Sequence, residues 1–234
     1  MTRVTRLRIH SRNWDAYLGD GYFRAHGRSL VHLTLDGVQL DSFTTFTYTI
    51  AAFPKLESLS LLYVRWAARL GPARREDWAD GRALNLKTLR MGWVFSTTGK
   101  LKEIVEWLRR GRTSPLSIER LALGATYPSD GDLLTVLPLL APTLLHVEIF
   151  QRIHDIRGLL VQALDATLAD PHFVRLKSVT VTGITYDSDL LNAAHYDAQV
   201  EEQLPLLARR DGIEVSIKMA YQDPRWFEIP PVTS

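Results

Sequence analysis

A six-position apolar motif, L-x-x-L-x-L with Val, Ile or Met also allowed, recurs along the chain and constrains its fold more than any other feature. The steps between the first seven copies are 26, 26, 30, 32, 26 and 32 residues. Copies in fixed order are typical of repeat proteins, where each unit buries its apolar face only against its neighbours. The copies occupy residues 4–9, 30–35, 56–61, 86–91, 118–123, 144–149 and 176–181, with a degraded eighth at 213–217.

The spacing within the motif predicts a strand. The fourth and sixth residues lie two apart, so a strand places both side chains on one face. The first residue precedes the strand, where the chain bends inward, and its side chain also joins the core. The second, third and fifth residues then face solvent. Stacked copies predict an α/β solenoid with a curved parallel β-sheet on its concave face, helices and loops on its convex face, and seven to eight irregular repeats in a single domain over residues 1–234.

The segments between the motifs support this fold class. Four of them carry apolar residues at helical spacing and predict helices on the convex side, at residues 41–54, 99–111, 129–142 and 155–171, the last with Asp155 as N-cap. Residues 187–210 are longer and more polar, and we expect them to form the helical region of the last repeat. Residues 68–83 are rich in charge and glycine and predict a mostly exposed loop insertion.

The composition indicates an ordinary soluble, globular protein. Of the 234 residues, 46% are hydrophobic and 23% are charged, which argues against wholesale disorder. The chain has 0 cysteines, so it forms no disulfides and we expect it to be intracellular, cytoplasmic or nuclear. Its longest apolar run, residues 133–147, contains two prolines and is too short to span a membrane.

With its repeats aligned, the chain resembles the leucine-rich-repeat superfamily over nearly its full length. The ninth repeat position, Asn or Cys in many members, is apolar in the better copies here: Val38, Val64, Val94 and Ile184. The phrases SLVHLTLDGVQLDSFTTF and IAAFPKLESLSLLYVRW resemble the irregular repeats of fungal F-box proteins. In that family the repeat domain captures a substrate, and an N-terminal F-box docks onto a Skp-type adaptor of a cullin ubiquitin ligase.

The resemblance implies a binding role without adaptor docking. The first motif opens at Val4, so this chain contains no F-box, and adaptor contact would need sequence outside it. The first core layer would also need a cover. Either Trp14 and Tyr17 with their neighbours supply it, or sequence upstream does.

The residues between the leucines predict a binding surface on the concave face. Arginine beside Tyr and Trp is the composition of protein-binding hot spots, because it combines rigid apolar area with a fork of donors. Three aromatic residues, Tyr63, Trp93 and Phe150, are predicted to lie just past the strands. We therefore expect the partner to contact eight side chains: Arg8, His32, Tyr63, Arg90, Trp93, Arg120, His146 and Phe150. The alternative is that these residues are merely solvated, that Arg120 and Glu148 neutralise each other, and that Tyr63 and Trp93 fold over the strand ends.

The sequence indicates a protein-interaction module and no enzyme. It lacks the nucleophile-elbow, zinc-protease, dinucleotide and phosphate-loop motifs. Its 7 histidines have no metal-ligand spacing, so we expect neither a metal nor a cofactor. An alternative is nucleic-acid or anionic-ligand binding by a basic column, which the small net charge of +2 disfavours. An enzyme with an unfamiliar site is the least favoured possibility. The basic column comprises Arg6, Arg8, His32, Arg90 and Arg120.

Overall fold

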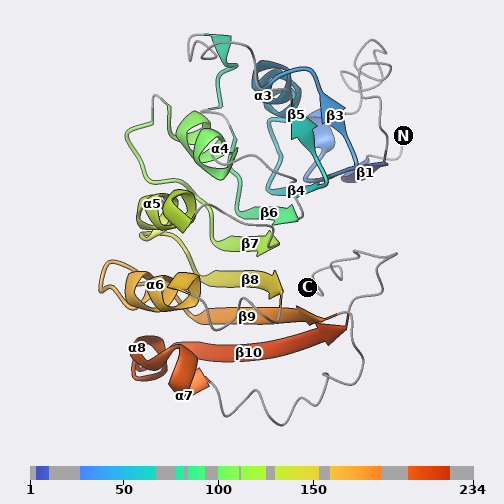
Figure 1. Cartoon of the computed structure of the whole chain (residues 1–234). Helices are drawn as coiled ribbons and strands as arrows, with labels where there is room; N and C mark the ends of the chain where they lie inside the picture. Colours follow the sequence, from blue (N-terminus) through green and yellow to red (C-terminus); the bar gives the residue numbers. More distant parts are fainter. Residues whose placement is uncertain are drawn as a thin grey trace.

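The computed structural model describes residues 4–10, 27–66, 77–81, 84–92, 100–110, 112–124, 130–152, 159–185 and 200–221. In these ranges the chain forms an α/β structure around a parallel sheet of 8 strands (Figure 1), as the repeat predicts. The strands, in their order across the sheet, are β1 (Arg6–His10), β2 (His32–Asp36), β4 (Ser58–Leu62), β6 (Thr88–Gly92), β7 (Arg120–Gly124), β8 (His146–Arg152), β9 (Ser178–Thr185) and β10 (Glu214–Tyr221). A second, 2-stranded parallel sheet consists of β3 (Gln39–Leu40) and β5 (Arg65–Trp66).

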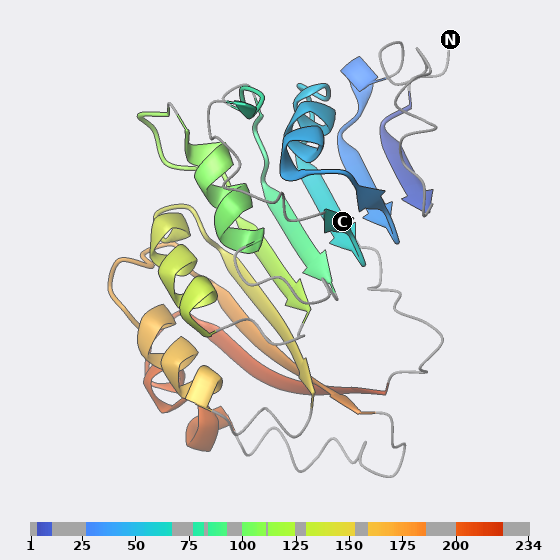
Figure 2. The same ribbon diagram turned by 45° about the horizontal axis from the view of Figure 1, so that its top comes forward.

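The helices follow one another along one side of the large sheet (Figures 1 and 2). Within the described residues they occupy the intervals where the apolar spacing predicts them, and each ends earlier than predicted. Asp155 and residues 187–199 lie outside the described residues. The helices are the short 3₁₀ turn η1 (Gly27–Ser29), α3 (Phe43–Ala51), α4 (Lys100–Arg109), α5 (Asp130–Leu140), α6 (Leu159–Leu168), α7 (Val200–Gln203) and α8 (Pro205–Ala208).

Neighbouring strands pair in one common register. Leu33 lies beside Leu59, and Leu59 lies beside Leu89. The same motif positions meet in each of the seven strand pairs, even though the steps between motifs vary. Residues at one motif position therefore form a straight row across the whole sheet.

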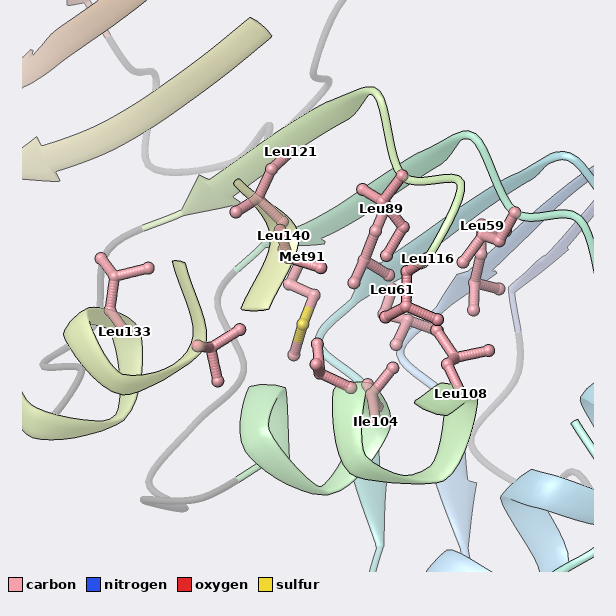
Figure 3. Packing of buried hydrophobic residues seen from close by; sticks show 14 of the residues in the cluster. Leu59, Leu61, Leu89, Met91, Ile104, Leu108, Leu116, Leu121, Leu133 and Leu140 are labelled. Atoms are coloured by element: carbon pink, nitrogen blue, oxygen red, sulfur yellow. The ribbon is translucent and has the colours of Figure 1, made fainter. Parts of the chain in front are cut away.

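The fourth and sixth motif residues form the sheet side of the core. Leu59 and Leu61 are fully buried, and so is Leu56, the first motif residue, which lies before the strand. Burying one such side chain contributes about 1.5–3 kcal/mol. Figure 3 shows leucines of β4, β6 and β7 directed toward the apolar side chains of α4 and α5, including Ile104 and Leu133. The first motif is buried less completely, since Val4 and Leu7 are only half-buried, and Trp14 and Tyr17 lie outside the described residues.

The prediction of a mostly exposed loop at residues 68–83 is wrong for Trp78, Ala79 and Gly81, which are buried, while Asp77 and Asp80 are exposed. Trp78 and Ala79 are 9% and 8% exposed. The Ala79 amide donates to Thr47 Oγ1 at 3.1 Å, and the Ala79 carbonyl accepts from Trp107 Nε1 at 2.7 Å. A Cβ atom on Gly81 would meet the Trp107 ring at 3.0 Å, so glycine lets the backbone pass close to the indole. This short segment, although polar in sequence, joins α3 to α4 within the core.

Aromatic rings fill the space around this segment. Phe43 and Phe46 of α3 stack on each other at 5.4 Å, and Phe46 stacks on Trp66 of β5 at 5.2 Å. Trp78 meets Phe43 edge to face at 5.0 Å, and Trp107 meets Phe46 in the same way at 5.8 Å. Offset and edge-to-face pairs of this kind add about 0.5–1.5 kcal/mol each beyond their buried area.

A buried carboxylate joins the helices of the last two repeats. Asp165 of α6 is 3% exposed and accepts hydrogen bonds from the amides of Leu206 and Leu207 at 3.0 and 2.9 Å. These amides belong to the first turn of α8, whose own N-cap residue, Leu204, has no side chain able to accept them. At and just beyond the C-terminal end of α6, Arg210 donates to the carbonyls of Leu168, Asp170 and Phe173.

The turns after β2 and β4 are each held by a backbone hydrogen bond to the next repeat. The Gly37 amide donates to the Leu62 carbonyl at 2.8 Å, and the Tyr63 amide donates to the Gly92 carbonyl at 3.1 Å. Val38 and Val64, at the ninth repeat position, are fully buried. Gly37 and Tyr63 occupy the same place in successive repeats, and both adopt a left-handed backbone, with φ of 65° and 53°.

Candidate functional site

The polar residues of the motif share the sheet face that points away from the core. In β2, Leu33 and Leu35 are buried, whereas the alternate residues His32 and Thr34 are partly exposed. We call this second surface the open face. Since the register is uniform, its residues form three rows across the sheet. The row at the strand starts contains Arg6, His32, Ser58, Thr88, Arg120, His146, Ser178 and Glu214.

The two further rows of the open face follow at two-residue intervals along the strands. The middle row contains Arg8, Thr34, Ser60, Arg90, Ala122, Glu148, Thr180 and Ser216. The last row contains His10, Asp36, Leu62, Gly92, Gly124, Phe150, Thr182 and Lys218. Neighbours within a row lie about 4.8 Å apart in a parallel sheet, so their side chains can interact.

The centre of the open face brings together two of the predicted residues. Arg120 lies beside His146 in the row at the strand starts. His146 Nδ1 is 2.8 Å from Ser178 Oγ on the next strand. Burial lowers the pKa of His146, and the positive charges of Arg120 and Lys177 lower it further, against the opposing effect of Glu119 and Glu214. The neutral imidazole is therefore favoured, and it can exchange a hydrogen bond with the serine hydroxyl.

Arg90 occupies the middle row near a carboxylate on the second strand along. Ala122 lies between Arg90 and Glu148 in the register and presents only a methyl group. Burial lowers the pKa of Arg90, while the charge of Glu148 raises it. The expected neutralisation of Arg120 by Glu148 does not occur in the described part of the chain, where no ion pair joins them. The Glu148 charge acts on Arg90, because both residues belong to the same row.

Two predicted residues lie at the amino-terminal edge of the open face. Arg8 Nη2 forms an ion pair with Asp36 Oδ2 at 2.8 Å, and His10 Nδ1 is 3.3 Å from the same oxygen. The Asp36 side chain is 10% exposed. Arg8 thus has a local structural partner. Burial also lowers the pKa of His32, together with the positive charge of Arg6 and against that of Glu57.

The predicted aromatic residues fall into three different situations. Tyr63 follows β4 and has the left-handed backbone described above. The prediction that Phe150 lies just past its strand is wrong, because β8 continues to Arg152 and places Phe150 in the last row, beside Gly124 and Thr182. Trp93 lies outside the described residues. The structure therefore brings Arg120, His146 and Phe150 onto neighbouring strands, while Arg8 and His32 lie several strands away.

Sequence reasoning missed most of the last row. Asp36 lies two residues beyond Thr34, so the alternation of core-facing and outward-facing side chains continues past the sixth motif position. This continuation could have placed Asp36 on the open face from the sequence. The hydroxyl pair Thr180 and Ser216, with Oγ1 and Oγ 3.1 Å apart, extends the polar surface to β10. Within the described ranges, no three His, Asp or Glu side chains gather into a group that could hold a metal ion.

The chain was compared with known proteins in three ways. Comparison of the chain with protein-family models, with the curated proteins and with the solved structures finds no match. None of the helices in the described part of the chain has the length and apolar content that a membrane crossing needs.

Proposed function

We propose that the chain is a leucine-rich-repeat-type solenoid that binds a protein partner on its open face. The in-phase leucines, the parallel sheet and the helices along one side support the solenoid assignment. The observation that carries the binding role is the pair Arg120 and His146 on the adjacent strands β7 and β8, with Phe150 four residues farther along β8 on the same face. Arg120 is exposed and has no ion pair among the described residues, so its guanidinium is available to a partner.

The surface chemistry favours a protein over a nucleic acid. Carboxylates alternate with the basic groups on and around the open face, as Asp36 does with Arg8 and Glu148 with Arg90. A surface that binds phosphates without sequence preference needs basic groups with few acidic neighbours. A mixed-charge surface with one large aromatic side chain instead matches the composition of protein interfaces.

A site-specific crosslinker tests this role without advance knowledge of the partner. A photoreactive amino acid at position 120 should yield a discrete adduct in extract from the source cells. The control places the photoreactive amino acid at position 102. Lys102 is exposed on α4, on the helical side, and the amino acid there should not yield that adduct. Equal labelling from both positions would contradict the proposal.

The captured protein then permits an affinity test. Arg120→Ala and His146→Ala should each weaken its binding at least about tenfold in calorimetry, as hot-spot truncations do. Lys102→Ala should leave the affinity unchanged. An affinity that survives the combined change Arg120→Ala and His146→Ala would overturn the assignment of the open face.

The cellular setting that we propose is substrate recognition for an F-box-type ubiquitin ligase. Its support is the resemblance of residues 29–46 and 50–66 to the repeats of fungal F-box proteins. Purification of the full-length gene product from its own cells should recover a Skp-type adaptor and a cullin. Recovery of the open-face partner without either subunit would reject the ligase setting and leave the binding role intact.

A further inference from the structure

The large sheet ends in a long edge strand. In the described part of the chain, β10 has a single neighbour, β9, with which it pairs over 8 residues. Strands β1, β2, β4 and β6 have 5 residues each. A long edge presents a row of backbone donors and acceptors that can pair with another strand.

The outward-facing groups of β10 follow from its pairing with β9. The Glu214 amide donates to the Lys177 carbonyl at 2.8 Å, so Glu214 directs its backbone groups toward β9. Backbone groups alternate in direction along a strand. The amides and carbonyls of Val215, Ile217 and Met219 therefore point outward from the sheet.

The charges of β10 are complementary to those of a second β10 in one register only. Glu214 and Lys218 are both exposed and lie four residues apart on the open face. An antiparallel pair with its two-fold axis at Ser216 places each Glu214 opposite Lys218 of the other copy. An axis at Ile217 leaves Lys218 opposite serine, and an axis at Lys218 places two lysines together. Opposite charges directly across a strand pair stabilise it, whereas like charges destabilise it.

The same register also satisfies the outward-facing backbone. It sets Val215 opposite Ile217 of the second copy, and this is a position where antiparallel strands exchange two hydrogen bonds. Val215 is only half-buried at the edge, and pairing would cover it. Apolar side chains are also exposed in the last two repeats, where Val174 and Leu206 are 74% and 48% exposed.

We propose that β10 pairs antiparallel with β10 of a second copy of this chain, with the two-fold axis at Ser216. A two-fold pair is self-complementary, so each copy contributes the same residues and the assembly closes as a dimer. This interface leaves Arg120, His146 and Phe150 two or three strands away from the dimer axis. The dimer is therefore independent of the partner binding proposed above.

A charge swap tests the register. The wild-type chain should sediment as a dimer that dissociates on dilution. Lys218→Glu places two carboxylate pairs face to face and should raise the dissociation constant at least about tenfold. Glu214→Lys should do the same. The double change Glu214→Lys with Lys218→Glu keeps the net charge and should restore the wild-type constant.

A disulfide tests the position of the axis. The natural sequence has 0 cysteines, so a single introduced thiol can form only an intermolecular bridge. Ser216→Cys should oxidise to a covalent dimer, because non-hydrogen-bonded residues at the axis have Cα atoms about 4.5 Å apart. Glu214→Cys is the matched control. Its two Cα atoms would lie about 14 Å apart, which is too far for a disulfide.

Three results would overturn the dimer. A chain that is monomeric at all accessible concentrations would show that Lys218 serves instead to protect a solvated edge. A dissociation constant that neither Lys218→Glu nor Glu214→Lys changes would show that the interface lies elsewhere. Equal crosslinking through positions 214 and 216 would exclude the proposed axis.

Discussion

The two halves of the molecule fill the layer beneath the same sheet in different ways. In the first half, β1 to β6 with α3, the layer consists mainly of rings, among them Phe43, Phe46 and Trp66. In the second half, β7 to β10 with α5, α6 and α8, it consists of aliphatic side chains such as Leu137, Val161 and Leu164. From α4 onward, consecutive helices pack against each other along the sheet, whereas α3 meets α4 through the rings of Phe43, Phe46 and Trp107.

This difference shows how one repeat motif accommodates different connecting segments. Where a full helix follows the strand, leucines and valines at helical spacing fill the layer. The second repeat adds the short strand β3 before its helix α3, and β3 pairs with β5 of the third repeat. Larger rings fill this region. The Trp66 indole nitrogen Nε1 donates to Glu103 Oε2 at 3.1 Å, whereas the buried Trp78 Nε1 has no hydrogen-bond partner among the described residues.

The largest effect should come from removing the ring that joins α3 to α4. Trp107 is fully buried, contacts Phe43 and Phe46 and donates to the Ala79 carbonyl. Trp107→Ala should lower the free energy of unfolding by about 4 kcal/mol, since it leaves a cavity and an unpaired carbonyl. Chemical denaturation measures this loss. Leu164→Ala is the matched aliphatic change and should cost about 3 kcal/mol. A smaller loss of unfolding free energy for Trp107→Ala than for Leu164→Ala would contradict the greater importance of the aromatic layer.

A smaller effect should follow from removing the cap that joins the last two repeats. Asp165→Ala removes two hydrogen bonds to the amides of Leu206 and Leu207. We expect a loss of about 2–3 kcal/mol, because bonds to a charged acceptor are stronger than neutral ones. Hydrogen exchange should become faster in α8 and β10 while that of β2 and β4 stays unchanged. Uniformly faster exchange would show that the cap supports the entire fold instead.

Tyr63 should prove to be a strained residue of the first half. The left-handed region costs a residue with a side chain about 1 kcal/mol relative to glycine. Tyr63→Gly should therefore be more stable than Tyr63→Ala by about 1 kcal/mol in thermal or chemical unfolding, since only the glycine relieves the backbone. Gly37→Ala, the reciprocal change one repeat earlier, should destabilise by a similar amount. Equal stability of the two Tyr63 variants would remove the argument for strain.

The smallest effect should be a pH dependence common to both halves. Burial lowers the pKa of His32 and of His146 from the ordinary value of 6.5. The unfolded chain therefore takes up protons at a higher pH than the folded chain. Stability should be highest above about pH 6.5 and should fall as the pH drops from there toward the folded-state pKa values. Each imidazole should titrate below 6.5 in NMR, and His146→Gln should flatten the curve.

The sequence predicted what depends on the motif itself. The spacing of the leucines determined which side chains enter the core, and alternation along the strands then placed His32, Arg90 and Arg120 on the opposite face. The uniform register brought Arg120 beside His146, as the alignment of the motifs implies.

The sequence could not predict what depends on contacts outside the motif. The burial of Trp78 and Ala79 depends on Thr47 and Trp107, which lie about 30 residues away on either side. The position of Phe150 depends on how far β8 continues, and pairing with the longer strand β9 supports that length. The charge of Glu148 acts on Arg90 because Ala122, which lies between them in the register, has only a methyl side chain.

The common register of the strands has a consequence for how such a chain can change through evolution. The steps between motifs range from 26 to 32 residues, and the rows of the open face stay straight regardless. Insertions and deletions between motifs are therefore absorbed on the helical side. A single residue inserted within a motif would turn every following side chain of that strand to the other face. Connecting segments can thus change in length freely while the surface pattern is inherited intact.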